Sequence, residues 1–119
     1  MQKQQGVKRV YLAFLNSSRA FMWLTKNEAA FKQELIISLL LFPVSFFLNV
    51  TALEQLILIA VLVFVLIVEI INTAIEATID RIGLEHHPLS GLAKDLGSLA
   101  VLLSLFLAVA TWVIVLWPF

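Results

Sequence analysis

The sequence contains no cysteine, which excludes disulfides, thiolate metal sites and cysteine nucleophiles together. Glycine and proline are scarce, with four and three residues, and neither a G-x-x-x-x-G-K-[ST] motif nor a G-x-G-x-x-G motif is present. Charged residues make up only 13% of the 119 positions, and the formal net charge is zero. Because there is neither a basic excess nor an aromatic-basic pattern, we expect no nucleic-acid partner.

What the chain does contain is apolar: 61% of its residues are hydrophobic, too many for the surface of a soluble domain of this length. The length predicts one domain with no separate soluble catalytic module. The first 25 residues lack an apolar h-region followed by a small-residue cleavage site, so we expect no signal peptide. The sequence therefore predicts an integral membrane protein.

The hydrophobic pattern predicts an all-α, polytopic membrane protein. Residues 7–25 combine apolar positions at helical spacing with a basic side, which is typical of an amphipathic helix lying on the membrane surface. Residues 28–49, 53–82 and 90–117 are expected to form three transmembrane helices, because each carries a long apolar run. Pro43 lies inside the first of them and is expected to kink it without ending it.

Local signals predict the ends of these helices and their orientation. Asn27 is expected to cap the first spanning helix, Gly83 to end the second in a left-handed conformation, and Ser90 or Gly91 to begin the third. Six of the eight basic residues precede the apolar run that starts at Leu35, the other two flank the second connection, and the 49–55 connection has none. The positive-inside rule then places the N-terminus in the cytoplasm and the C-terminus in the periplasm.

A polar stripe interrupts the second predicted span. Its members are spaced i, i+3, i+7 and i+11 and therefore fall within an arc of roughly 60° on one helix face: Glu69, Asn72, Glu76 and Asp80. A carboxylate near the centre of a membrane helix costs about 2.5–3.5 kcal/mol, so such residues indicate a functional site. Carboxylates with few cations nearby suit Mg²⁺, which commonly bridges them to nucleotide phosphates. Glu69, the deepest member, would be partly desolvated and therefore a stronger base.

The spacing by itself leaves other interpretations open. The acidic stripe could belong to a non-enzymatic oligomer that conducts protons or cations. Glu28 and Glu76 could pair with lysines, and Lys94 could simply satisfy Asp95. Ala93 and Gly97 form a small-residue edge that is interpreted as a helix-packing surface.

Three segments at linked spacing resemble the prokaryotic diacylglycerol kinases, namely residues 27–34, 68–81 and 85–98. The similarity extends from about Arg9 to Trp117. It implies an enzyme that transfers the γ-phosphate of ATP to diacylglycerol and so forms phosphatidic acid. It also implies a homotrimer in the bacterial inner membrane, with active sites between neighbouring protomers.

The resemblance assigns Glu69 as the general base, and Glu28 and Glu76 as ligands of a divalent metal, Mg²⁺. Residues expected to contact ATP come from the surface helix, the stripe and the second connection: Arg9, Asn16, Glu28, Glu76, Asp80, Glu85, His86, His87, Lys94 and Asp95. Residues expected on the side of the lipid substrate are Glu34, Glu69, Asn72, Ser98 and Trp112. Asn16 and His86 stand where the family commonly has tyrosine. Undecaprenol kinase, of the same fold family, is the alternative activity, and the complete 27–34 segment favours diacylglycerol.

Overall fold

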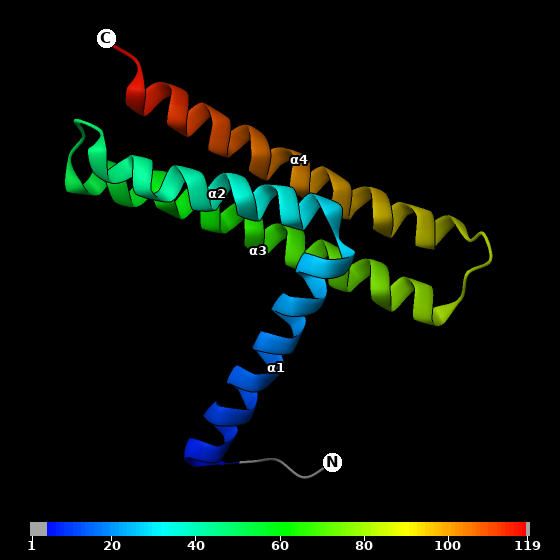
Figure 1. Cartoon of the computed structure of the whole chain (residues 1–119). Coiled ribbons are helices and arrows are strands. Elements are labelled where there is room, and N and C mark those ends of the chain that lie inside the picture. Colours follow the sequence, from blue (N-terminus) through cyan, green and yellow to red (C-terminus); the bar gives the residue numbers. More distant parts are fainter. Residues whose placement is uncertain (1–4, 119) are drawn as a thin grey trace.

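The computed structural model describes residues 5–118, which form α1 (Gly6–Asn27), α2 (Ala29–Phe47), α3 (Ala52–Ile82) and α4 (Pro88–Leu116). Helices α2, α3 and α4 lie side by side, whereas α1 leaves this bundle at the start of α2 (Figure 1). Each of the three bundled helices is long and apolar enough to cross a membrane. The prediction of an all-α chain with three such helices is confirmed; the surface position of α1 and the trimer stay predictions.

Helix α3 is the centre of the bundle. In its most apolar window 39% of the residues are buried, against 11% in the corresponding windows of α2 and α4. The buried cluster consists of Val61, Val65 and Ala108, with Leu105 and Trp112 packed against it. The indole Nε1 of Trp112 donates a hydrogen bond to the carbonyl of Leu58 at 3.2 Å, which ties α4 to α3 far from the connection between them.

The outer faces of α2 and α4 remain apolar and exposed, including Leu40 and Phe106. Apolar surface this extensive is stable only against lipid tails or another protein surface. The surface of one chain is therefore that of a membrane protein.

A capping box fixes the start of α3. The Thr51 hydroxyl accepts a hydrogen bond from the Glu54 amide at 3.1 Å, and the Glu54 carboxylate accepts one from the Thr51 amide at 3.0 Å. This pair satisfies two backbone N–H groups that a helix start leaves open. Helix α2, on the other side of the connection, continues through Pro43.

The corner between α1 and α2 differs from the prediction. Asn27 does not cap α2; it is the last residue of α1, and its side-chain Nδ2 donates to the carbonyl of Trp23 at 2.9 Å. Glu28 is the N-cap, with extended backbone angles that turn the chain within one residue. Phe21 and Phe31 then meet edge to face across the corner, with ring centroids 6.0 Å apart. An aromatic contact between α1 and α2 is thus found at this corner, where a side-chain cap was expected.

The connection between α3 and α4 also corrects two expectations. Gly83 follows the end of α3 with a φ of 175°, which is extended and not left-handed. Helix α4 begins at Pro88, two residues earlier than the first expected start, because proline at the first helical position needs no N–H partner. The His87 ring Nδ1 accepts a hydrogen bond from the Leu89 amide at 3.1 Å and caps this helix. Pro88 is thus the first residue of α4.

Candidate active site

The polar stripe on α3 runs from the protein interior to its surface. Glu69 and Asn72 are buried, with exposed fractions of 5% and 8%, whereas Glu76 is half-buried and Asp80 is exposed. The gradient arises because α2 covers only the first part of α3, and the last turns of α3 extend past α2 together with α4 (Figure 1). One helix face therefore connects a desolvated carboxylate to groups in contact with water.

Two carboxylates from outside α3 join this stripe. Glu28, at the corner between α1 and α2, and Glu76 both lie close enough to Glu69 to repel its charge, and Glu69 does the same to Glu34 on α2. Among residues 5–118, the structure contains one ion pair, between Lys94 and Asp80. No lysine or arginine of this region pairs with the other four carboxylates of the site, Glu28, Glu34, Glu69 and Glu76. A cluster of carboxylates without paired cations is a favourable place for a divalent cation to bind.

The donor set fits Mg²⁺, the metal that the family resemblance implies. Mg²⁺ prefers oxygen ligands. A protein usually supplies one or two carboxylates, and water and phosphate oxygens complete the coordination. Across the described part of the chain, no three His, Asp or Glu side chains converge on one point. The arrangement thus suits a metal carried in with phosphates better than a closed cage made of protein ligands.

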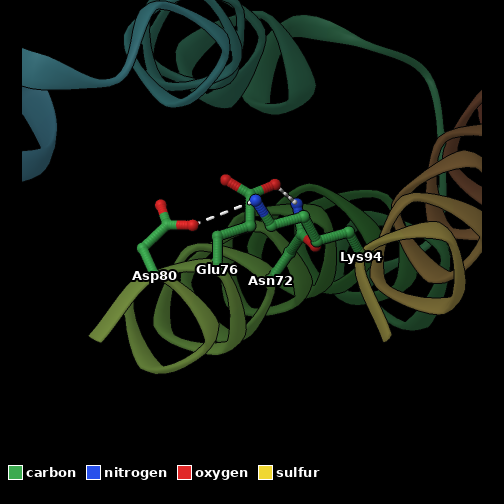
Figure 2. A network of polar contacts seen from close by, with 4 residues as sticks. All are labelled: Asn72, Glu76, Asp80 and Lys94. Carbon is green, nitrogen blue, oxygen red and sulfur yellow. Dashed lines mark hydrogen bonds and ion pairs between the residues drawn. The ribbon is translucent and has the colours of Figure 1, made fainter. Parts of the chain in front are cut away.

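Hydrogen bonds hold the middle of the stripe in place (Figure 2). The side-chain Nδ2 of Asn72 donates to Oε1 of Glu76 at 3.3 Å, one helical turn away on α3. Lys94 reaches over from α4, and its Nζ lies 3.0 Å from Oδ1 of Asp80. The partner of Lys94 is thus Asp80 on the neighbouring helix, not the adjacent Asp95. Both side chains of this pair are about half exposed, 45% and 49%, so the pair is weak and can be exchanged for another anion.

A polar cavity of about 220 Å³ lies at the end of the α3–α4 hairpin. Its lining includes five of the residues expected to contact ATP: Asp80, Glu85, His86, His87 and Lys94. Ligand pockets for drug-sized molecules usually exceed about 300 Å³, so this cavity can enclose only part of a nucleotide. His87 contributes twice, since the same side chain caps α4.

The other expected nucleotide residues lie elsewhere in this chain. Arg9 and Asn16 are exposed on α1, which packs mainly against α2, and the Asn16 side chain accepts a hydrogen bond from Arg19. Arg9 precedes Glu28 by 19 residues, about 28 Å along a helix. Asp95 is exposed and is not part of the cavity lining. One protomer therefore assembles only part of the predicted nucleotide set.

On the lipid side, the structure brings together two predicted residues that are 78 positions apart. Glu34 and Trp112 line one cavity of about 210 Å³ between α2, α3 and α4, whose remaining walls are almost wholly apolar. Oε2 of Glu34 is buried there without a hydrogen-bond partner among the described residues. Ser98, by contrast, is exposed on α4 and does not line this cavity.

Comparison with known proteins decides the family. The family model for prokaryotic diacylglycerol kinase matches residues 15–116. The chain belongs to that family. It is 53% identical to a diacylglycerol kinase of Escherichia coli strain K12 over 91 residues, which cover 76% of this chain and 75% of that protein. It is 44% identical to a diacylglycerol kinase of Pseudomonas aeruginosa strain PAO1 over 113 residues, covering 95% and 92% of the two chains.

The family membership confirms the prediction of a lipid kinase and, with the three apolar helices, of a bacterial membrane protein. The structure also contains a feature that the sequence did not predict. A second apolar cavity, of about 600 Å³, lies between α1 and Ile70 of α3 and is lined by Phe14 and Phe21 among others. Aromatic residues at helical spacing on a helix expected to anchor the chain were the available signal, but they do not by themselves predict a cavity.

Proposed function

We propose that this kinase transfers the γ-phosphoryl group of ATP to the hydroxyl group of diacylglycerol, releasing ADP and phosphatidic acid. The observation that carries the proposal is the gradient along α3, from buried Glu69 to exposed Asp80. A reaction between a lipid and a water-soluble phosphate donor needs both environments within one site. The names of the two relatives support diacylglycerol as the acceptor over undecaprenol.

Glu69 is the proposed general base. Its carboxylate takes the proton from the lipid hydroxyl while that oxygen attacks the γ-phosphorus and the bond from phosphorus to the ADP oxygen breaks. Burial suits Glu69 to this role, since a carboxylate with little water around it is a stronger proton acceptor. The proton then leaves to water when phosphatidic acid and ADP depart, which restores the carboxylate.

Glu28 and Glu76 are the proposed ligands of Mg²⁺. Both carboxylates lie near Glu69, and Asn72 holds one oxygen of Glu76 and leaves the other available. A Mg²⁺ ion held by Glu28 and Glu76 would neutralise part of the charge of the donor phosphates. Glu28 and Glu76 thus orient the donor phosphates toward the base, which is most of what a protein contributes to phosphoryl transfer.

Lys94 is the proposed phosphate contact. Its ammonium group is held near the cavity by Asp80 and can exchange that carboxylate for a phosphate oxygen. The remaining nucleotide contacts are assigned to Arg9, Asn16, Glu85, His86, His87 and Asp95. Because Arg9 and Asn16 are separated from the cavity within one chain, a homotrimer in which a neighbouring α1 completes the site accounts for the set.

The lipid is proposed to approach from the buried end of the stripe. Glu34, Asn72, Ser98 and Trp112 are assigned to this side, and the cavity between Glu34 and Trp112 offers apolar walls to an acyl chain. We further propose that the protein lies in the inner membrane with its N-terminus and the α3–α4 connection in the cytoplasm, where ATP is available.

Phosphate transfer from labelled ATP in detergent–lipid mixed micelles tests the proposal, with Mg²⁺ present and diacylglycerol and undecaprenol offered in parallel. We expect labelled phosphatidic acid, and we expect a chelator to abolish it and added Mg²⁺ to restore it. Label mainly in undecaprenol would keep the site and change the acceptor. If well-folded protein labels neither lipid, ion flux through sealed vesicles without ATP becomes the activity to measure, and the kinase assignment fails.

A further inference from the structure

Gly97 on α4 faces the side chain of Asn72 on α3. Gly97 is buried in the first half of α4. A Cβ atom placed on it would lie 3.2 Å from Cγ of Asn72 and well inside van der Waals contact with Oδ1. Glycine is a poor residue for a helix interior, so its presence there requires a reason. The reason visible in the structure is the room that the amide of Asn72 occupies.

The orientation of this amide follows from the chemistry of its neighbour. The carboxylate of Glu76 can only accept hydrogen bonds, so the nitrogen of the Asn72 amide must face it, as it does at 3.3 Å. The oxygen Oδ1 then faces Gly97, where it is buried without a hydrogen-bond partner in residues 5–118. Among the described residues, no polar group of α4 donates a hydrogen bond to this oxygen. It persists because Gly97 leaves space for the oxygen and Glu76 accepts from the nitrogen.

We infer that Gly97 is a positioning residue of the phosphoryl-transfer site, which acts by leaving the space that lets Asn72 direct its amide at Glu76. Gly97 itself touches neither substrate. The inference rests on the proposed role of Glu76 as a metal ligand. A residue that orients a metal ligand through a hydrogen bond typically changes metal affinity or activity by about 10- to 100-fold when it is lost.

The direct test is Gly97→Ala. Because the atom it meets is the end of a short side chain, the added methyl group displaces the Asn72 amide and the helix itself persists. We expect the Mg²⁺ concentration for half-maximal activity to rise, or kcat to fall, by about 10- to 100-fold. A purely structural role for Gly97 predicts a loss of folded protein with the Mg²⁺ dependence unaltered, and that result would overturn the inference.

Two further variants distinguish a positioning role of Gly97 from a purely structural one. In an Asn72→Ala background the displaced amide is absent, so Gly97→Ala should add less than about a twofold change in activity, although single effects at independent sites normally add. Equal effects of Gly97→Ala in both backgrounds would contradict the inference. Gly91→Ala is the matched control for thermal unfolding, since it adds the same methyl group to α4 with no atom within 4 Å.

A measurement without ATP keeps this inference distinct from the proposed function. Thermal unfolding of the four proteins in detergent (wild type, both single variants and the double variant) reports whether Gly97 and Asn72 are energetically coupled. We expect non-additive shifts in midpoint temperature. If wild type transfers no phosphate to diacylglycerol while the coupling is present, the proposed function fails and the contact stands. Additive shifts overturn the contact, whatever the activity.

Discussion

Replacing Lys94 by alanine separates a structural from a functional role for the ion pair with Asp80. The two side chains are about half exposed, and their charged atoms are 3.0 Å apart. Exposed pairs of this kind contribute about 0.2–1 kcal/mol to stability. We therefore expect Lys94→Ala to shift the midpoint of unfolding only slightly.

The expected effect on catalysis is larger. A hydrogen bond from a charged group is worth about 1.5–3 kcal/mol, so losing a phosphate contact should lower kcat/KM for ATP by about 10- to 150-fold. The assay follows ADP release while ATP is varied with Mg²⁺ in excess and diacylglycerol saturating. KM for diacylglycerol should stay within about twofold, because Lys94 lies on the aqueous side of the stripe.

Asp80→Asn is the matched control, because it removes the ion pair and keeps the lysine. We expect a smaller loss of kcat/KM for ATP than Lys94→Ala causes, because the lost ion pair is worth about 1 kcal/mol or less and asparagine keeps polar atoms in the cavity. If Lys94→Ala and Asp80→Asn lower kcat/KM equally, Lys94 acts through the ion pair, and the proposed contact with the phosphate is refuted.

Three other changes test separate parts of the structure. Glu69→Gln should lower kcat by at least about 100-fold while the unfolding midpoint stays equal or rises, because it removes the base and a buried charge together; an active variant would exclude Glu69 as the base. Trp112→Phe should cost about 0.5–1.5 kcal/mol of stability in reversible unfolding, because the bond to the Leu58 carbonyl is lost while the ring is kept; an unchanged stability would contradict that bond's role. Thr51→Ala should cost about 0.5–2 kcal/mol by opening the capping box with Glu54, measured in the same assay, and no loss would show that the cap contributes nothing.

The parts of this fold that could be predicted are those that depend on one helix at a time. The order and type of the helices follow from the length of the apolar runs, and the stripe from Glu69 to Asp80 follows from helical periodicity, so both could be stated from the sequence. The burial gradient along the stripe was expected for the same reason and is observed. The resemblance to a kinase family added the chemistry, which the comparisons confirm at the level of the family.

The parts that could not be predicted depend on how helices meet. Two contacts depend on the register between α3 and α4: Lys94 pairs with Asp80, and Gly97 faces Asn72. This register cannot be predicted from the hydrophobic periodicity of either helix alone. The corner at Asn27 was mispredicted because a side chain that can cap one helix can also bond back into the previous one. Helix ends are decided by a competition of this kind between local options of similar free energy.

The length of α3 links the site to the thickness of the bilayer. Its 31 residues measure about 46 Å, whereas a hydrocarbon layer is about 30 Å thick and takes up about 20 of them. Counted from Ala52, the boundary of that layer falls near Asn72, so Glu69 would lie just inside it and Glu76 just outside. Hydrophobic mismatch would then change the hydration of both carboxylates. A thinner membrane would expose Glu69, the proposed base, to water, and a thicker one would remove Glu76, the proposed metal ligand, from water. The activity of the enzyme would then depend on the thickness of the bilayer around it.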